Sequence, residues 1–248
     1  MPNESYVYLG DTARVPYGNK SAETVQLYSQ QCATFLNRHN VKLIVVACNT
    51  ASALALDDLQ QQFDIPIVGM IDPAARQAVA STRNGSIGVI GTRATIGSEA
   101  YQRSISKVTS ATNVHVHSVA CPLFVPLVEE GWLDTPATRL VAETYIQPLL
   151  QHNIDTLVLG CTHYPMLEPV LSSILPSVTL IDCGSCAAIE AQRLVAQSDP
   201  SAGTPKISIF VTDTNPAFSS LATRFLGFRV ETPTRVSIDG SSDHEGQS

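Results

Sequence analysis

The chain has 248 residues, of which 44% are hydrophobic, and its formal net charge is −7 at neutral pH. A chain of this length buries a sizeable core, and its acidic balance is the opposite of the basic surface of a dedicated nucleic-acid binder. The sequence has no apolar run approaching the roughly 20 residues of a membrane helix, and its opening Met-Pro-Asn-Glu-Ser lacks the features of a signal peptide. It therefore predicts a cytoplasmic protein with no membrane or direct nucleic-acid partner.

Strand-like and helix-like patterns alternate along the chain. Short apolar runs rich in β-branched residues indicate strands buried on both faces, and the segments between them have helical spacing of apolar residues. Such alternation predicts an α/β class with mainly parallel sheets. Strands are predicted at 6–9, 43–46, 67–71, 86–90, 114–120, 156–159, 178–181 and 206–212, helices at 22–39, 51–63, from 72, 136–151, 166–175, 186–197 and 216–226, and disorder over 237–248.

The six cysteines are predicted to be reduced thiols, because a long chain without a secretory signal has little use for disulfides. Cys183 and Cys186 form a single C-x-x-C pair, and neither a second such pair nor a close pair of histidines completes a zinc site. His115 and His117 lie on one face of a predicted strand, where exposed surface is the simpler interpretation. No metal site is predicted.

Two cysteines follow apolar strands in the same way. Cys48 comes after a strand and precedes a helix, and Cys161 repeats this order 113 positions later. Ligands of open α/β sheets bind at the carboxyl ends of strands, and the N-terminus of a helix lowers the pKa of a thiol. The repetition predicts two similar α/β units whose cysteine turns face each other across a cleft.

Two thiols on opposite sides of a cleft suit racemisation. One thiolate removes the proton of the α-carbon, and the opposite thiol returns a proton to the other face. Two other interpretations remain open at this point. A cysteine after an apolar strand is more often a small buried apolar residue, and a neighbouring cysteine and histidine also suit nucleophilic acyl transfer.

Polar residues beside the two cysteines are candidates for holding a substrate. His163 is placed to exchange a proton near Cys161. Hydroxyl, amide and backbone N–H groups in these turns suit carboxylates and ammonium groups. The substrate-binding candidates in the two turns are Asn49, Thr50 and Thr162, joined by Thr92 and Thr95, which serve equally well as ordinary turn residues.

Five segments resemble the signature segments of bacterial glutamate racemase, in the order and spacing of that family. The resemblance extends from about residue 2 to about residue 226. The wider family of cofactor-independent racemases also includes aspartate and hydantoin racemases. The segments are Tyr-Leu-Gly-Asp-Thr-Ala-Arg-Val-Pro-Tyr-Gly (8–18), Ala-Cys-Asn-Thr-Ala-Ser (47–52), Gly-Val-Ile-Gly-Thr (88–92), Cys-Pro-Leu-Phe-Val-Pro-Leu-Val-Glu-Glu-Gly (121–131) and Leu-Gly-Cys-Thr-His-Tyr-Pro (159–165).

The resemblance implies interconversion of L- and D-glutamate without any cofactor, supplying D-glutamate for peptidoglycan. It implies that Cys48 and Cys161 are the catalytic thiols and that His163 assists the second thiol. By the same match, Glu129 is an acidic residue near the cleft. The implied substrate-binding positions are Tyr17, Gly18, Asn49, Thr50, Thr162 and His163.

The family fold implies two pseudo-symmetric α/β domains with the active site between them. The expected first domain comprises residues 1–71 and 184–230, and the second comprises 72–183. Family members open with a strand and an Asp-Ser-Gly-x-Gly-Gly turn, and this sequence has no matching segment before its Met-Pro-Asn-Glu. We therefore expect an uncovered apolar surface where a central strand would lie, and reduced activity.

Two alternatives to a glutamate racemase stay open on the sequence. The first is a catalytically weak or inactive relative that binds an amino acid or a protein partner. The second is a racemase for another amino acid, such as aspartate. The sequence also leaves a homodimer open.

Overall fold

The computed structural model describes residues 1, 3–109, 113–196, 204–214, 218, 222–223, 227 and 232–238. Its strands are β1 (Tyr6–Gly10), β2 (Ile44–Val46), β3 (Ile67–Gly69), β4 (Ser86–Gly91), β5 (His115–Ala120), β6 (Thr156–Gly160), β7 (Thr179–Asp182), β8 (Ile207–Val211) and β9 (Thr234–Arg235). Its α-helices are α1 (Ala22–Asn37), α2 (Asn49–Gln62), α3 (Ile71–Ser81), α4 (Arg93–Gly97), α5 (Ala100–Val108), α6 (Phe124–Glu129), α7 (Pro136–Leu150), α8 (Glu168–Ile174) and α9 (Cys183–Val195), and two 3₁₀ turns are η1 (Tyr17–Asn19) and η2 (Tyr164–Leu167).

Every strand pair among the described residues is parallel, which confirms the predicted α/β class. The largest sheet has the order β5-β4-β6-β7. A second sheet has the order β1-β8-β9, and β2 pairs with β3 in a third. Parallel strands need crossover connections, and the helices between successive strands supply them.

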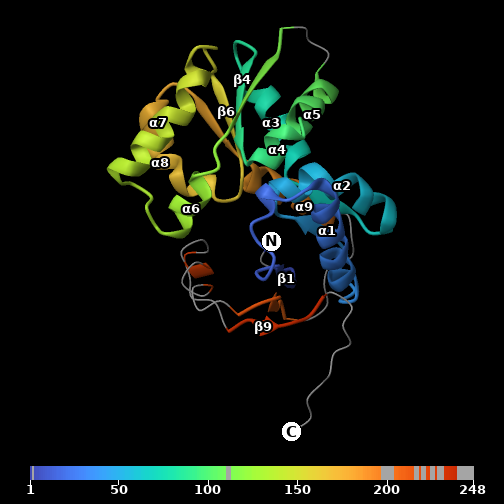
Figure 1. Cartoon of the computed structure of the whole chain (residues 1–248). Helices are drawn as coiled ribbons and strands as arrows, with labels where there is room; N and C mark the ends of the chain where they lie inside the picture. The colour runs from blue at the N-terminus through green and yellow to red at the C-terminus, as the bar shows by residue number, and fades with distance from the viewer. Residues whose placement is uncertain are drawn as a thin grey trace.

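The four-stranded sheet is covered by helices on both faces (Figure 1). One face packs against α6, α7 and α8, where Phe124 and Ile146 are fully buried. The other face packs against α3, α5 and α9 through small residues such as Ala74 and Ala187. All five residues of β6 are buried, as expected for a central strand covered on both sides. The four-stranded sheet thus contains β6, whose carboxyl end leads directly into Cys161.

In Figure 1, β1 and β9 lie in the lower half of the molecule, below α2. A smaller core forms where α1 and α2 pack on the β2–β3 pair, and it includes Ala33, Ile44, Leu59 and Ile67. Here Tyr8 of β1 is 49% exposed and Val45 of β2 is 39% exposed. The two smaller sheets therefore expose large apolar side chains.

The structure differs from the predicted elements in several places. The strand predicted over 67–71 ends at Gly69 because α3 begins at Ile71, and α6 and β9 were not predicted. Helix α9 begins at Cys183, three residues before the predicted start, because the Asp182 carboxylate accepts hydrogen bonds from Gly184 N and Ser185 N and so caps the helix. The two helices α4 and α5 occupy a stretch for which only a turn was predicted. The predicted helix over 216–226 lies largely outside the described residues, as does the predicted disordered tail from residue 239 onward.

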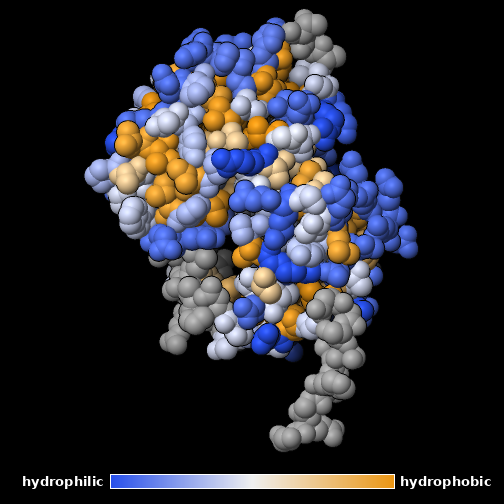
Figure 2. Space-filling view, viewed as in Figure 1, coloured by the Kyte–Doolittle hydropathy of each residue, from blue (hydrophilic) through white to orange (hydrophobic). Residues whose placement is uncertain are grey.

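Among the described residues, no helix has both the length and the apolar composition needed to cross a membrane. The same part of the chain contains no group of three or more His, Cys, Asp or Glu side chains arranged to hold a metal ion. All six cysteines are free thiols. Apolar side chains gather on the face formed by α6, α7 and α8 (Figure 2), where Leu140 is 65% exposed and Trp132 is 51% exposed.

Candidate active site

Cys48 lies between β2 and α2, at the N-cap of the helix. Its Sγ accepts a hydrogen bond from Ala51 N at 3.5 Å. The next two residues, Asn49 and Thr50, form the first turn of α2 and are each 2% exposed. The thiol therefore faces the positive end of the helix dipole, which favours negative charge at that position.

Cys161 follows β6 directly and is 7% exposed. His163 lies beside it, with Nδ1 at 3.9 Å from the cysteine Sγ and 3.4 Å from Thr162 Oγ1. The other ring nitrogen, Nε2, is 3.2 Å from Glu129 Oε1. A carboxylate at Nε2 fixes the orientation of the imidazole ring. The imidazole is thus placed to take a proton from the Cys161 side.

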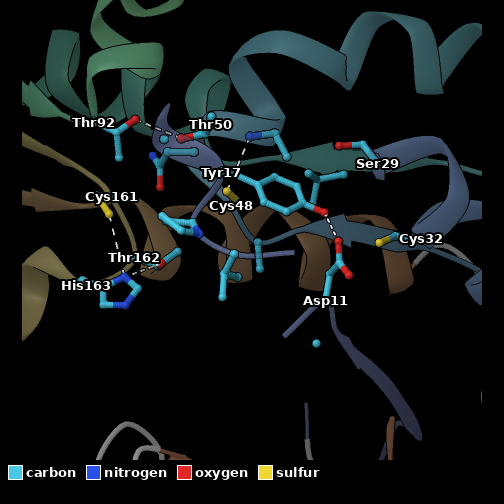
Figure 3. Close-up of a pocket in the computed structure, with 18 of the residues that line it drawn as sticks. Asp11, Tyr17, Ser29, Cys32, Cys48, Thr50, Thr92, Cys161, Thr162 and His163 are labelled. Carbon is cyan, nitrogen blue, oxygen red and sulfur yellow. Dashed lines mark hydrogen bonds between the residues drawn. The ribbon is translucent and has the colours of Figure 1, made fainter. Parts of the chain in front are cut away.

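One cavity of about 550 Å³ is lined by both thiols. Its lining also includes eight of the other predicted site residues: Tyr17, Gly18, Asn49, Thr50, Thr92, Glu129, Thr162 and His163. Figure 3 shows Cys161, Thr162 and His163 at one end of the cavity and Cys48 near its middle. The carboxyl ends of β2 and β6, strands of two different sheets, therefore open into the same space, as expected for an open α/β site.

Three threonine hydroxyls form a cluster beside Cys48. Thr50 Oγ1 is 2.9 Å from Thr92 Oγ1 and 3.2 Å from Thr95 Oγ1, and the last two are 3.0 Å apart. Thr92 also caps α4 by accepting a hydrogen bond from Thr95 N. Thr92 lines the cavity, whereas Thr95 is 1% exposed and supports the other two from behind. Thr92 is therefore both the N-cap residue of α4 and a residue of the cavity wall.

The loop after β1 approaches this cluster closely. A Cβ added to Gly18 would lie 2.7 Å from Thr92 Cβ, so only glycine fits there without displacing the threonine. Tyr17 donates its hydroxyl hydrogen to the Asp11 carboxylate, which also binds Arg14 Nε at 2.8 Å. This network holds Tyr17 at the edge of the cavity.

Burial raises the pKa of both thiols. It raises the pKa of Cys161 to about 12, although the backbone N–H of His163 acts in the opposite direction. Burial also raises the pKa of Cys48, against the opposing effect of the Ala51 and Thr50 N–H groups. An ordinary thiol has a pKa of about 8.5. Each thiol therefore needs a base or a bound charge before it becomes a thiolate at neutral pH.

A buried chain of hydrogen bonds behind Cys48 escaped the sequence analysis. Asn49 Nδ2 donates to Tyr101 Oη at 2.7 Å, and Tyr101 Oη is 3.0 Å from Cys183 Sγ. Cys183 in turn donates to Leu159 O at 3.2 Å, two residues before Cys161. The chain joins the turn of one candidate thiol to the strand of the other. The only sequence signal was Cys183, which the sequence analysis named only as part of a C-x-x-C pair.

We expect Tyr101→Phe to leave the fold intact and to lower the free energy of unfolding by about 1–3 kcal/mol, because it removes the hydroxyl that accepts the hydrogen bond of the buried Asn49 amide. Urea denaturation followed by circular dichroism measures this change. Tyr145→Phe is the matched control, since the Tyr145 hydroxyl accepts only a long bond of 3.4 Å from Leu123 N. Equal stabilities of the two variants would contradict a structural role for the chain.

Comparison with known proteins decides the family. The family model for Asp/Glu/hydantoin racemases matches residues 1–191 of the chain. The chain belongs to this racemase family. Among curated relatives, the glutamate racemase of Geobacter metallireducens is 45% identical over 98% of this chain and 91% of its own length. The glutamate racemase of Chlorobaculum parvum is 47% identical over 92% of this chain and 85% of its own length.

Solved structures give the same result for this racemase. Glutamate racemase from Francisella tularensis in complex with D-glutamate has a TM-score of 0.90 and 37% identity, covering 96% of this chain and 89% of its own. The Thermus thermophilus enzyme in complex with β-chloro-D-alanine has a TM-score of 0.84 and 42% identity, covering 96% and 88%. The resemblance to glutamate racemase and the two-domain racemase fold class are both confirmed, and the chain is an isomerase of this branch.

Proposed function

We propose that this racemase interconverts L- and D-glutamate with Cys48 and Cys161 as its two acid–base groups and without a cofactor. The observation that supports this most directly is that two thiols, each at the carboxyl end of a parallel strand, line one cavity. Acyl transfer needs only one nucleophilic thiol, so it gives no reason for the second. The relatives' D-glutamate complex supports glutamate as the substrate.

In the direction that uses Cys161 as the base, the proposed reaction begins when His163 takes the proton of Cys161. The thiolate removes the α-proton of one enantiomer, and the opposite thiol donates its proton to the other face of the carbanion. One thiol has then gained a proton and the other has lost one, so the pair is set for the reverse direction. Glu129, at 3.2 Å from Nε2, stabilises the imidazolium formed during the first transfer.

The substrate contacts follow from the lining of the cavity. The Thr50 and Thr92 hydroxyls and Asn49 at the N-terminus of α2 form a polar wall suited to a carboxylate. Thr162 and His163 lie at the Cys161 end, and Tyr17 and Gly18 lie on the loop after β1. We propose that these residues bind the two carboxylates and the ammonium group of glutamate, with Thr95 holding the hydroxyl cluster in place.

The direct test measures deuterium incorporation at the α-carbon of L- and D-glutamate in heavy water, with circular dichroism recording inversion. We expect both enantiomers to exchange and to invert. A folded protein that binds D-glutamate but exchanges neither enantiomer would contradict the proposal and favour a binding protein. Faster inversion of aspartate than of glutamate would assign the thiols to another substrate.

We also propose the domain boundaries, the cellular compartment and the oligomeric state. We propose the division into domains 1–71 with 184–230 and 72–183, supported by the separate β5-β4-β6-β7 sheet. Free thiols at all six cysteines fit a reducing compartment such as the cytoplasm, where peptidoglycan precursors would use D-glutamate. The exposed apolar face of α6 and α7 supports a homodimer, since apolar patches of this kind mark protein contacts.

A further inference from the structure

Tyr101 lies between the two turns that carry the candidate thiols. It belongs to α5 and is 1% exposed. The core around it contains Val68 of β3 together with Ile181 of β7, so the β2–β3 pair and the four-stranded sheet pack together at this point. Tyr101 is therefore buried where the two sheets that lead to Cys48 and Cys161 meet.

The ring of Tyr101 contacts the end of the strand that leads to Cys161. A Cβ added to Gly160, the residue before Cys161, would lie 3.1 Å from Tyr101 Cε2 and 2.6 Å from Ile90 O. The backbone of β6 thus lies directly against the tyrosine ring, with no side chain between them. Because protein interiors are close-packed, the ring limits how near the carboxyl end of β6 can come to α5.

The hydroxyl of Tyr101 contacts the turn that carries Cys48. It accepts a hydrogen bond of 2.7 Å from the side-chain amide of Asn49, the residue after Cys48. It is also 3.0 Å from Cys183 Sγ, and the S–H of Cys183 donates to Leu159 O at 3.2 Å. Because Cys183 has only one hydrogen to donate, its sulfur accepts the hydrogen of the Tyr101 hydroxyl. The hydroxyl is therefore an acceptor and a donor at once.

The separation of the two thiols matters for a reaction with two acid–base groups. Each thiol must reach one face of the same α-carbon, and a misplacement of about 1 Å can slow an enzymatic reaction by about 10²-fold. Tyr101 contacts a neighbour of each thiol, and it is not among the described residues that line the cavity. It can therefore act on the reaction only through the positions of other groups.

We propose that Tyr101 is a positioning residue that holds the Cys48 and Cys161 turns at the separation that racemisation by two thiols requires. Its ring bears on Gly160 and its hydroxyl holds Asn49. The inference rests on the proposed racemisation and assigns no proton transfer to Tyr101. Burial raises the pKa of its hydroxyl well above the ordinary value, so the hydroxyl stays neutral and keeps both hydrogen bonds at neutral pH.

The experiment compares Tyr101→Phe with the unmodified full chain, using L-glutamate in heavy water. NMR measures loss of the α-proton, and circular dichroism measures inversion. Phenylalanine keeps the ring against Gly160 but removes the bond to Asn49, so the Cys48 turn is held less firmly. More carbanions are then reprotonated by the thiol that formed them, once its S–H has exchanged with the solvent. We expect inversion to slow about tenfold, and the ratio of exchange without inversion to inversion to rise at least about threefold.

This ratio distinguishes positioning from a loss of stability. Partial unfolding removes active molecules, so it lowers exchange and inversion in the same proportion and leaves their ratio unchanged. The pH dependence of inversion gives a second measurement. It should keep its shape in Tyr101→Phe, because the hydroxyl donates no proton to the substrate.

Cys183 tests the same hydrogen bonds from their other end. Cys183→Ala leaves the Tyr101 hydroxyl without its acceptor, whereas Cys183→Ser keeps a group that accepts from Tyr101 and donates to Leu159 O. We expect the alanine variant to show the raised ratio and the serine variant to stay within about twofold of the unmodified chain. This pair also decides the question if Tyr101→Phe does not fold.

Tyr145→Phe is the matched control, because Tyr145 belongs to α7 on the other face of the four-stranded sheet. An unchanged ratio in Tyr101→Phe, an equal rise in Tyr145→Phe, or an altered pH profile would each overturn the inference while the proposed reaction stands. An unmodified chain that neither exchanges nor inverts glutamate would refute the proposed reaction, and this inference with it.

Discussion

Replacing either Cys48 or Cys161 with serine is expected to reduce racemisation of glutamate by about 10²–10⁴-fold, because a hydroxyl is a far weaker acid than a thiol and the contribution of a positioned acid–base group has this size. Both side chains line the cavity, and serine fits the space of cysteine. The loss should therefore appear in kcat more than in KM, since the groups that bind the substrate remain.

The two serine variants should differ in one respect that a merely structural role would not produce. Each retains one thiol, which still removes the α-proton from the enantiomer on its own side and returns a solvent deuteron to the same face. We expect Cys48→Ser to exchange one enantiomer without inversion and Cys161→Ser to exchange the other. NMR of the α-proton in heavy water, combined with circular dichroism, measures both events.

Cys186→Ser is the matched control, because Cys186 is a free thiol outside the cavity lining. It should racemise glutamate at the rate of the unmodified chain. Two results would refute the two-base assignment: inversion at an unchanged rate in either active-site variant, or exchange of the same enantiomer by both.

The second large effect is expected at His163. Replacing it with glutamine removes the base whose Nδ1 lies 3.9 Å from Cys161 Sγ, while the pKa of that thiol stays raised by burial. At neutral pH very little thiolate would then form at Cys161. We expect the rate in the direction that uses Cys161 as the base to fall about 10²-fold.

The pH dependence distinguishes this role from a structural one. With the imidazole gone, hydroxide must remove the Cys161 proton, so the rate of the glutamine variant should rise about tenfold per pH unit from pH 7 to pH 9. The pKa of about 12 places the thiol far above this window, so no plateau is expected within it. Initial rates across this range, with both enantiomers as substrates, provide the measurement.

His115→Gln serves as the control, because His115 is exposed at the start of β5 and does not line the cavity. It should leave the rate and its pH dependence unchanged. A His163 variant whose rate is low but independent of pH would show that the imidazole only supports the shape of the site. Glu129→Gln should give a smaller loss in the same direction, since it leaves the imidazole in place.

The sequence alone was enough to predict the α/β class of the fold and to select Cys48 and Cys161 as the candidate catalytic thiols. Buried parallel strands are short apolar runs, and a site at their carboxyl ends follows from the connectivity of such sheets. The order of strand, cysteine and helix at Cys48 and Cys161 can therefore be recognised in the sequence. The match to glutamate racemase rested on contiguous segments, which a sequence also preserves, and the comparisons confirmed it.

Only the tertiary structure decided how distant side chains meet. The contacts of Asn49 with Tyr101, of Tyr101 with Cys183 and of His163 with Glu129 span 52, 82 and 34 positions in the chain. Local patterns carry no information about such pairs, because the pairs depend on how elements distant in the chain pack together. The start of α9 was missed for a related reason, since a cap depends on the exact direction of one carboxylate at Asp182.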